Sequence, residues 1–271
     1  MSNKLPVWAT TWQSLKAAVD FVARRPGLFG LLITMEFASA EGEDLVLAQA
    51  DFSVAPLLWS AVLTVAVTVL SAPIVVAAYR AVLTDDAQAR YDFRPPRTRL
   101  FAIVAGGWAL LFSAGVLALL SPMMLQDGPS WWSLFALLPL LVIVGIGVRL
   151  FLAFPLIAID QQSPFRRSAA MTKGRWWRIF AINFVIPLMT LVVVPAAAYF
   201  AATPSTTIAS QLFKLLNAAI GAFFILAATC ALGLTALWIM KRQVIGADGS
   251  RKAAAVISSS SHAAVAATEE S

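Results

Sequence analysis

Residues 149–182 read RLFLAFPLIAIDQQSPFRRSAAMTKGRWWRIFAI, and this stretch decides the fold. It starts in an apolar run, passes through a short connection rich in Arg and Lys, and ends in a second apolar run. We call this connection, residues 159–178, the elbow. Cytoplasmic loops of membrane proteins are enriched in Lys and Arg, and Trp is enriched at both membrane surfaces. The stretch is therefore typical of two membrane-spanning helices that are joined on the cytoplasmic side.

The composition of the whole chain agrees with a membrane protein. Its 271 residues are 60% hydrophobic and 13% charged, whereas soluble domains carry about 25% charged and about 45–50% apolar residues. A helix needs roughly 20 apolar residues to cross the hydrocarbon core, so the apolar segments account for about six spans. The predicted fold class is all-α, a polytopic integral membrane helical bundle that is preceded by an N-terminal interfacial amphipathic helix.

The order of these patterns divides the chain into three segments. In residues 1–25, Trp8 and Trp12 recur with apolar residues at helical spacing, which predicts a cytoplasmic amphipathic helix in the membrane interface. Residues 26–242 form the six-span membrane domain, and residues 243–271, rich in Ser, Ala and Gly, form a disordered cytoplasmic tail. The spans are expected at about 26–40, 54–82, 100–120, 134–158, 179–201 and 212–240.

The charges of the loops set the predicted orientation. Lys and Arg fall in the N-terminal region, in the loop 85–99, in the elbow and at the end of the last span. The alternate loops, among them the acidic loop 41–51, carry acids or no charge. The positive-inside rule then places both termini in the cytoplasm. We predict a multi-pass protein of a bacterial cytoplasmic (inner) membrane.

Side chains that catalysis and metal binding commonly need are scarce. Cys230 is the only cysteine and His262 the only histidine. An intrachain disulfide, a Cys-rich metal site, a His-based zinc site and a Ser-His-Asp triad are thereby excluded, and no catalytic signature motif was found among those sought. We expect no enzyme activity, no cofactor and no metal. The net charge of +6 would also fit nucleic acid, but the positions of the charges favour the membrane, so no nucleic-acid partner is expected.

Two ionisable residues lie inside predicted spans, where charge is costly and usually faces protein or water. Glu36 is ten residues beyond Pro26, and Arg149 is eleven before Asp160, so at about 1.5 Å per residue both lie roughly 15 Å from the cytoplasmic face. One hypothesis is that they pair or jointly line a polar cavity. The alternative is that Arg149 merely ties helices together and Glu36 lies near the outer surface. Lys214 is interpreted as a residue that snorkels to the outer interface.

The elbow is the second candidate site. Ser163 is predicted to cap a helix that has Pro164 at its first position. The basic and aromatic side chains that follow are candidates for contacts with anionic lipid headgroups or with a partner protein. The alternative is that they only set the topology. These residues are Arg166, Arg167, Lys173, Arg175, Trp176, Trp177 and Arg178.

The same stretch carries a resemblance to a known family. Its motifs are Arg149-Leu150, the run from Pro155 to Asp160, Arg167-Ser168, Met171-Thr172-Lys173-Gly174 and Trp177-Arg178. Together they resemble the membrane domain associated with glycerophosphoryl diester phosphodiesterases, and related bacterial six-helix membrane proteins without assigned activity. In those phosphodiesterases catalysis resides in a separate soluble domain, for which this chain has no room. The resemblance therefore implies a stand-alone membrane domain and offers no catalytic residues.

Two functions stay open at this point. The leading one is a non-enzymatic integral membrane protein that binds lipid or a partner protein, in membrane assembly or homeostasis. The alternative is a small transporter or transporter subunit that uses a polar site near Glu36 and Arg149. A solvent-accessible cavity that reaches Arg149 would favour transport, whereas a sealed core with an exposed basic elbow would favour lipid or partner binding.

Overall fold

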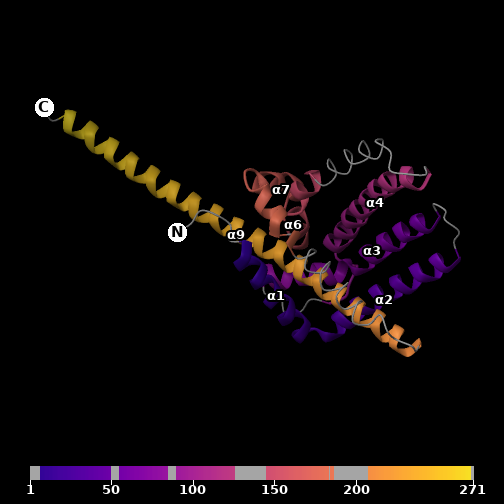
Figure 1. Cartoon of the computed structure of the whole chain (residues 1–271). Coiled ribbons are helices and arrows are strands. Elements are labelled where there is room, and N and C mark those ends of the chain that lie inside the picture. Colours follow the sequence, from indigo (N-terminus) through magenta and orange to yellow (C-terminus); the bar gives the residue numbers. More distant parts are fainter. Residues whose placement is uncertain are drawn as a thin grey trace.

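A computed structural model describes most of the chain, and its regular structure is helical throughout the described part. The described residues are 7–49, 55–84, 90–125, 145–182, 184–185 and 207–269. The helices are α1 (Val7–Arg24), α2 (Pro26–Gln49), α3 (Ala55–Thr84), α4 (Pro96–Leu125), α6 (Ala153–Ala158), α7 (Pro164–Thr172) and α9 (Thr207–Glu269). The predicted all-α class is confirmed over these residues (Figure 1).

Three of the described helices are long and apolar enough to cross a membrane. They contain the segments Leu58–Thr84, Pro96–Leu117 and Ser210–Gln243, which belong to α3, α4 and α9. A shorter apolar helix covers Gly145–Ala158. Many apolar side chains of α4 face outward, among them Ile103, which is 72% exposed. Long helices with exposed apolar faces fit a membrane protein, because lipid can cover such faces.

The first two helices follow one another with a break at a single residue. Pro26 begins α2, at the position where the missing N–H of proline removes no helical hydrogen bond. The N–H of Arg25 donates to the carbonyl of Phe21 at 2.9 Å, and its own carbonyl accepts from Phe29 at 3.2 Å. On α1 the side chains of Trp8 and Trp12 are exposed, at 74% and 61%.

One predicted loop is helical instead. The acidic segment 41–51 was expected to follow the first span as a loop, but α2 continues to Gln49. Side chains of two other helices contact the carboxylates of this segment. Lys214 of α9 lies 2.8 Å from Glu41 and 2.6 Å from Asp44, and Ser60 of α3 donates to Glu43 at 2.9 Å.

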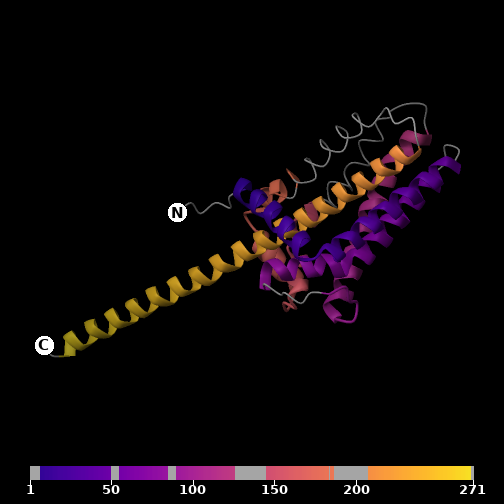
Figure 2. The same cartoon turned by 90° about the horizontal axis from the view of Figure 1, so that it is seen from below.

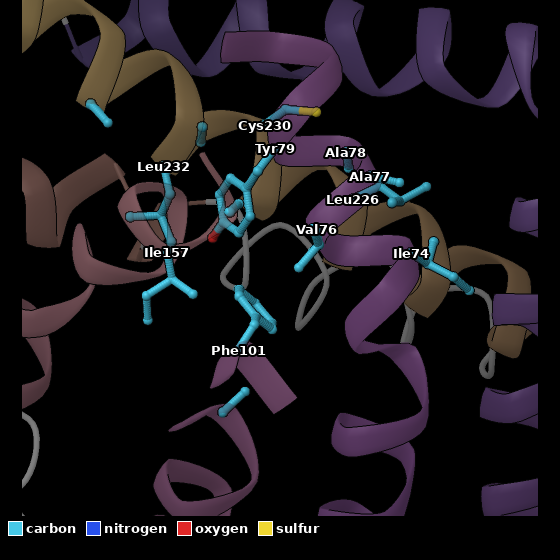
Figure 3. Packing of buried hydrophobic residues seen from close by; sticks show 14 of the residues in the cluster. Ile74, Val76, Ala77, Ala78, Tyr79, Phe101, Ile157, Leu226, Cys230 and Leu232 are labelled. Atoms are coloured by element: carbon cyan, nitrogen blue, oxygen red, sulfur yellow. The ribbon is translucent and has the colours of Figure 1, made fainter. Parts of the chain in front are cut away.

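The helices pack through small residues and aromatic side chains. The helices α2, α3 and α4 lie alongside one another, and α9 packs against α1, α2 and α3 (Figures 1 and 2). Gly106 of α4 lies so close to Val69 of α3 that an added Cβ would be 2.8 Å from its methyl group. In the core, the side chains of Tyr79, Phe101 and Leu232 point toward one another (Figure 3).

The helix α9 is much longer than a membrane span. It continues past Gln243 to Glu269 and projects out of the bundle (Figure 2). The composition of 243–271 predicted disorder, whereas the structure has a helix as far as Glu269. Many of these residues are alanines, and alanine has the highest intrinsic helix propensity.

Candidate functional site

The elbow is built on two residues with a left-handed backbone. Asp160 and Ser163 have φ values of 56° and 51°, a region that residues other than glycine adopt rarely. The helix α7 begins at Pro164, as predicted. The predicted side-chain cap is wrong, however, because Ser163 makes no capping bond with its side chain. Its carbonyl instead accepts the N–H of Arg167 at 3.1 Å.

One face of α7 is fixed against the rest of the bundle. Ser168, Met171 and Thr172 are buried. The hydroxyl of Ser168 donates to the carbonyl of Arg149 at 2.7 Å, so α7 is bonded directly to the backbone of the preceding apolar helix. The elbow is therefore an ordered element with a defined inner side.

The basic residues lie on the other side of the elbow, to different degrees. Arg166 and Lys173 are exposed, whereas Arg167, Arg175 and Arg178 are half-buried. Gly174 has a φ of 72°, which lets the chain turn directly after α7, because glycine adopts positive φ without strain. The exposed positive charge thus comes from both sides of this turn.

Aromatic side chains continue the same surface. The rings of Trp176 and Trp177 stack with their centroids 3.9 Å apart. Trp177 also contacts Phe180 edge-on, and Phe180 stacks on Phe184 at 5.4 Å. Trp177 and Phe184 are 64% and 53% exposed. A row of exposed rings beside exposed cations is the composition expected where a helix passes through lipid headgroups.

Glu36 and Arg149 are not brought together. Glu36 lines a pocket between the helices, whereas the side chain of Arg149 is exposed and does not line that pocket. No ion pair joins the two among the residues that the structure describes. The contact that Arg149 does make with the elbow goes through its backbone carbonyl, which accepts from Ser168. Any residue at position 149 would supply that carbonyl, so the role of the Arg149 side chain stays a prediction.

The pocket beside Glu36 has a volume of about 380 Å³ and is not enclosed. Besides α2, the wall is formed by the helices α3, α4 and α9, by Phe154 of α6 and by Phe151 directly before α6. Its polar side chains are Glu36, Thr68, Ser71, Tyr79, Trp108 and Thr229, and the other residues that line it are apolar.

Three features of these sites were not predicted from the sequence. Arg97 at the start of α4 is paired with Asp160 of the elbow at 2.5 Å. Lys214, interpreted as a snorkelling residue, is paired with Glu41 and Asp44. The aromatic wall of the pocket, which includes Trp108, gave no sequence signal, because aromatic residues within a span are equally typical of helix packing.

No family model matches this chain, and no curated protein or solved structure matches it either.

Proposed function

We propose that the chain is a six-span protein of a bacterial-type cytoplasmic membrane that binds anionic lipid headgroups at its elbow, without enzymatic activity. Both termini lie in the cytoplasm, and α1 rests in the membrane interface with Trp8 and Trp12 toward the headgroups. In this proposal the three remaining spans are α2 and the apolar segments around 134–158 and 179–201, parts of which lie outside the described residues. The resemblance of 149–182 to the membrane domain associated with glycerophosphoryl diester phosphodiesterases is part of the same proposal.

The observation that carries this function is the two-sided construction of the elbow. Its inner side is anchored by Ser168 and Met171, which are fully buried. Its outer side presents the exposed cations Arg166 and Lys173, and the stacked pair Trp176–Trp177 follows three residues after Lys173. A sequence signal for topology needs only positive charge, and a flexible loop would supply it. A fixed element that exposes both cations and rings also offers a phosphate-binding surface at the depth of the headgroups.

Lipid is favoured over a partner protein by the chemistry of this surface. Lys and Arg near a membrane each contribute about 1 kcal/mol to the attraction of anionic lipid. The exposed rings of Trp177 and Phe184 extend from the basic residues along one helix, which fits a gradient from headgroup to hydrocarbon. A lipid covers both parts at once.

Native mass spectrometry in mild detergent tests the proposal. The wild-type protein is expected to retain phosphatidylglycerol in preference to phosphatidylcholine, since only the first carries a net negative charge. The variant Arg166→Gln with Lys173→Gln removes the two exposed elbow cations and is expected to lose that preference. The variant Arg90→Gln with Arg94→Gln removes the same charge from exposed residues of the preceding cytoplasmic loop and is expected to keep it.

Two results would overturn the proposal. Equal retention of both lipids by the wild type would leave the elbow as a topology signal alone. A protein subunit that remains bound to the wild type and is lost only in the elbow variant would identify the surface as a docking site for a partner protein instead.

A further inference from the structure

The pocket beside Glu36 contains a carboxyl group without a basic neighbour in its wall. The side chains that line it include one carboxylate and no Lys, Arg or His. A charge in a largely apolar wall is costly unless an opposite charge or hydrogen-bond donors accompany it. A ligand that enters the pocket with a positive charge would supply that partner.

The hydroxyl groups of the pocket point to the same ligand charge. The hydroxyls of Thr68, Ser71 and Thr229 donate to carbonyls of their own helices. These bonds join Thr68 to Thr64 at 2.7 Å, Ser71 to Thr68 at 3.2 Å and Thr229 to Ile225 at 2.8 Å. Since a hydroxyl has one hydrogen and two lone pairs, each of the three offers the pocket an acceptor.

Aromatic rings supply much of the remaining wall. Tyr79 and Phe101 have ring centroids 6.0 Å apart, and Phe101 and Phe154 have theirs 5.3 Å apart. Trp108 and Phe151 meet edge-on at 6.4 Å. The faces of such rings attract cations. A carboxylate, hydroxyl lone pairs and ring faces therefore share one preference, for positive charge on an apolar body.

A metal ion would not find a suitable site here. Metal cations in proteins are held by several oxygen, nitrogen or sulfur ligands. No group of three or more His, Cys, Asp or Glu side chains that could hold one occurs in the part of the chain that the structure describes. The volume of about 380 Å³ also fits an organic molecule, since ligand pockets run from about 300 to 1,000 Å³.

We propose that the pocket between α2, α3, α4 and α9 binds a lipophilic organic cation, with the carboxylate of Glu36 as its counter-ion and the rings of Tyr79, Phe101 and Trp108 around its apolar groups. This binding site is separate from the elbow and does not depend on the lipid preference proposed above. The recognised chemistry is a quaternary ammonium or phosphonium centre that carries apolar substituents.

The test is equilibrium dialysis of the full-length protein in phosphatidylcholine nanodiscs, with tetraphenylphosphonium as the probe. Empty nanodiscs give the lipid background. Tetraphenylborate, which has the same shape and the opposite charge, is the matched probe. Saturable binding of the phosphonium alone is expected. The variant Glu36→Gln is expected to weaken it by a factor of about ten or more, the factor that corresponds to about 1.4 kcal/mol.

Two further variants distinguish a lost site from a misfolded protein. Asp44→Asn removes a carboxylate from the same helix outside the pocket, while Glu41 still pairs with Lys214, and it is expected to bind as the wild type does. Ala109→Phe fills the pocket from α4 without changing Glu36 and is expected to abolish binding. Unchanged binding in Glu36→Gln or in Ala109→Phe overturns the proposal, as does equal binding of tetraphenylborate or the absence of saturable binding to the wild type.

Discussion

The guanidinium of Arg97 contacts the carboxylate of Asp160 at 2.5 Å, although 63 residues separate them in the sequence. Arg97 lies in the first turn of α4, and Asp160 lies in the elbow directly after α6. The pair therefore fixes the elbow to the helix that begins at the preceding basic loop. Both side chains remain partly exposed, at 27% and 56%, so solvent screens the attraction.

A double-mutant cycle on this pair is expected to give a small coupling energy. Arg97→Gln and Asp160→Asn should each lower the free energy of unfolding by about 1 kcal/mol or less, as is usual for exposed pairs. Asn tolerates the left-handed backbone of residue 160. Asp160→Val does not, and should cost about 1–3 kcal/mol more. Unfolding in mixed micelles measures all five proteins: the wild type, the two single variants of the cycle, their double variant and Asp160→Val. Equal stability of the Asn and Val variants would show that the backbone at 160 is unstrained.

The Lys214 cluster leads to a second prediction. Lys214→Gln leaves the carboxylates of Glu41 and Asp44 close together without their cation, and like charges at short range repel. The melting temperature in detergent should fall by a few degrees and should partly recover in the double variant Lys214→Gln with Glu41→Gln. Lys241→Gln, at an exposed position of the same helix, is the control and should leave the melting temperature unchanged. A double variant less stable than Lys214→Gln alone would contradict the role of Lys214 as a shared cation.

The sequence could predict the elements that depend on local pattern. Apolar length identified the segments that became α3, α4 and the first part of α9, and Pro164 identified the start of α7. These signals are local, because span length and the position of proline depend on neighbouring residues alone. The six-span count and the orientation stay predictions.

The contacts that assemble the sites join residues far apart in the sequence, and for this reason they could not be predicted from it. Lys214 and Glu41 are 173 residues apart, and no spacing rule connects them. The hypothesis for Glu36 and Arg149 used equal depth in the membrane as its criterion. Depth leaves the rotation of each helix undetermined, and rotation decides which side chains face one another. Glu36 faces the pocket, whereas Arg149 does not line it.

Two glycines of one apolar helix should respond in opposite ways to alanine. A Cβ at Gly147 would collide with the indole ring of Trp108, whereas a Cβ at Gly145 would meet open space. Gly147→Ala should therefore cost about 1–3 kcal/mol through overpacking, while Gly145→Ala should be neutral or stabilising by up to about 1 kcal/mol. Because Trp108 also lines the pocket, Gly147→Ala should weaken phosphonium binding as well. Equal stability of the two variants would mean that Trp108 moves aside at no cost.

The last prediction concerns a loop tyrosine and has a defined pH dependence. The hydroxyl of Tyr91, in the loop before α4, donates to the carbonyl of Leu70 in α3 at 3.0 Å. Tyr91→Phe should therefore lower the free energy of unfolding by about 0.5–1.5 kcal/mol at neutral pH, toward the lower end because Tyr91 is 37% exposed.

Burial raises the pKa of Tyr91 above its ordinary value. In the unfolded chain the pKa of tyrosine is about 10. Above that pH the unfolded state releases the proton while the folded state retains it, so folding becomes less favourable as the pH rises. The advantage of the wild type over Tyr91→Phe should therefore be constant up to about pH 9 and shrink above about pH 10. Comparing the two proteins at each pH cancels the titration of every other group. An advantage that persists unchanged through this range would mean that the pKa of Tyr91 is not raised in the folded protein.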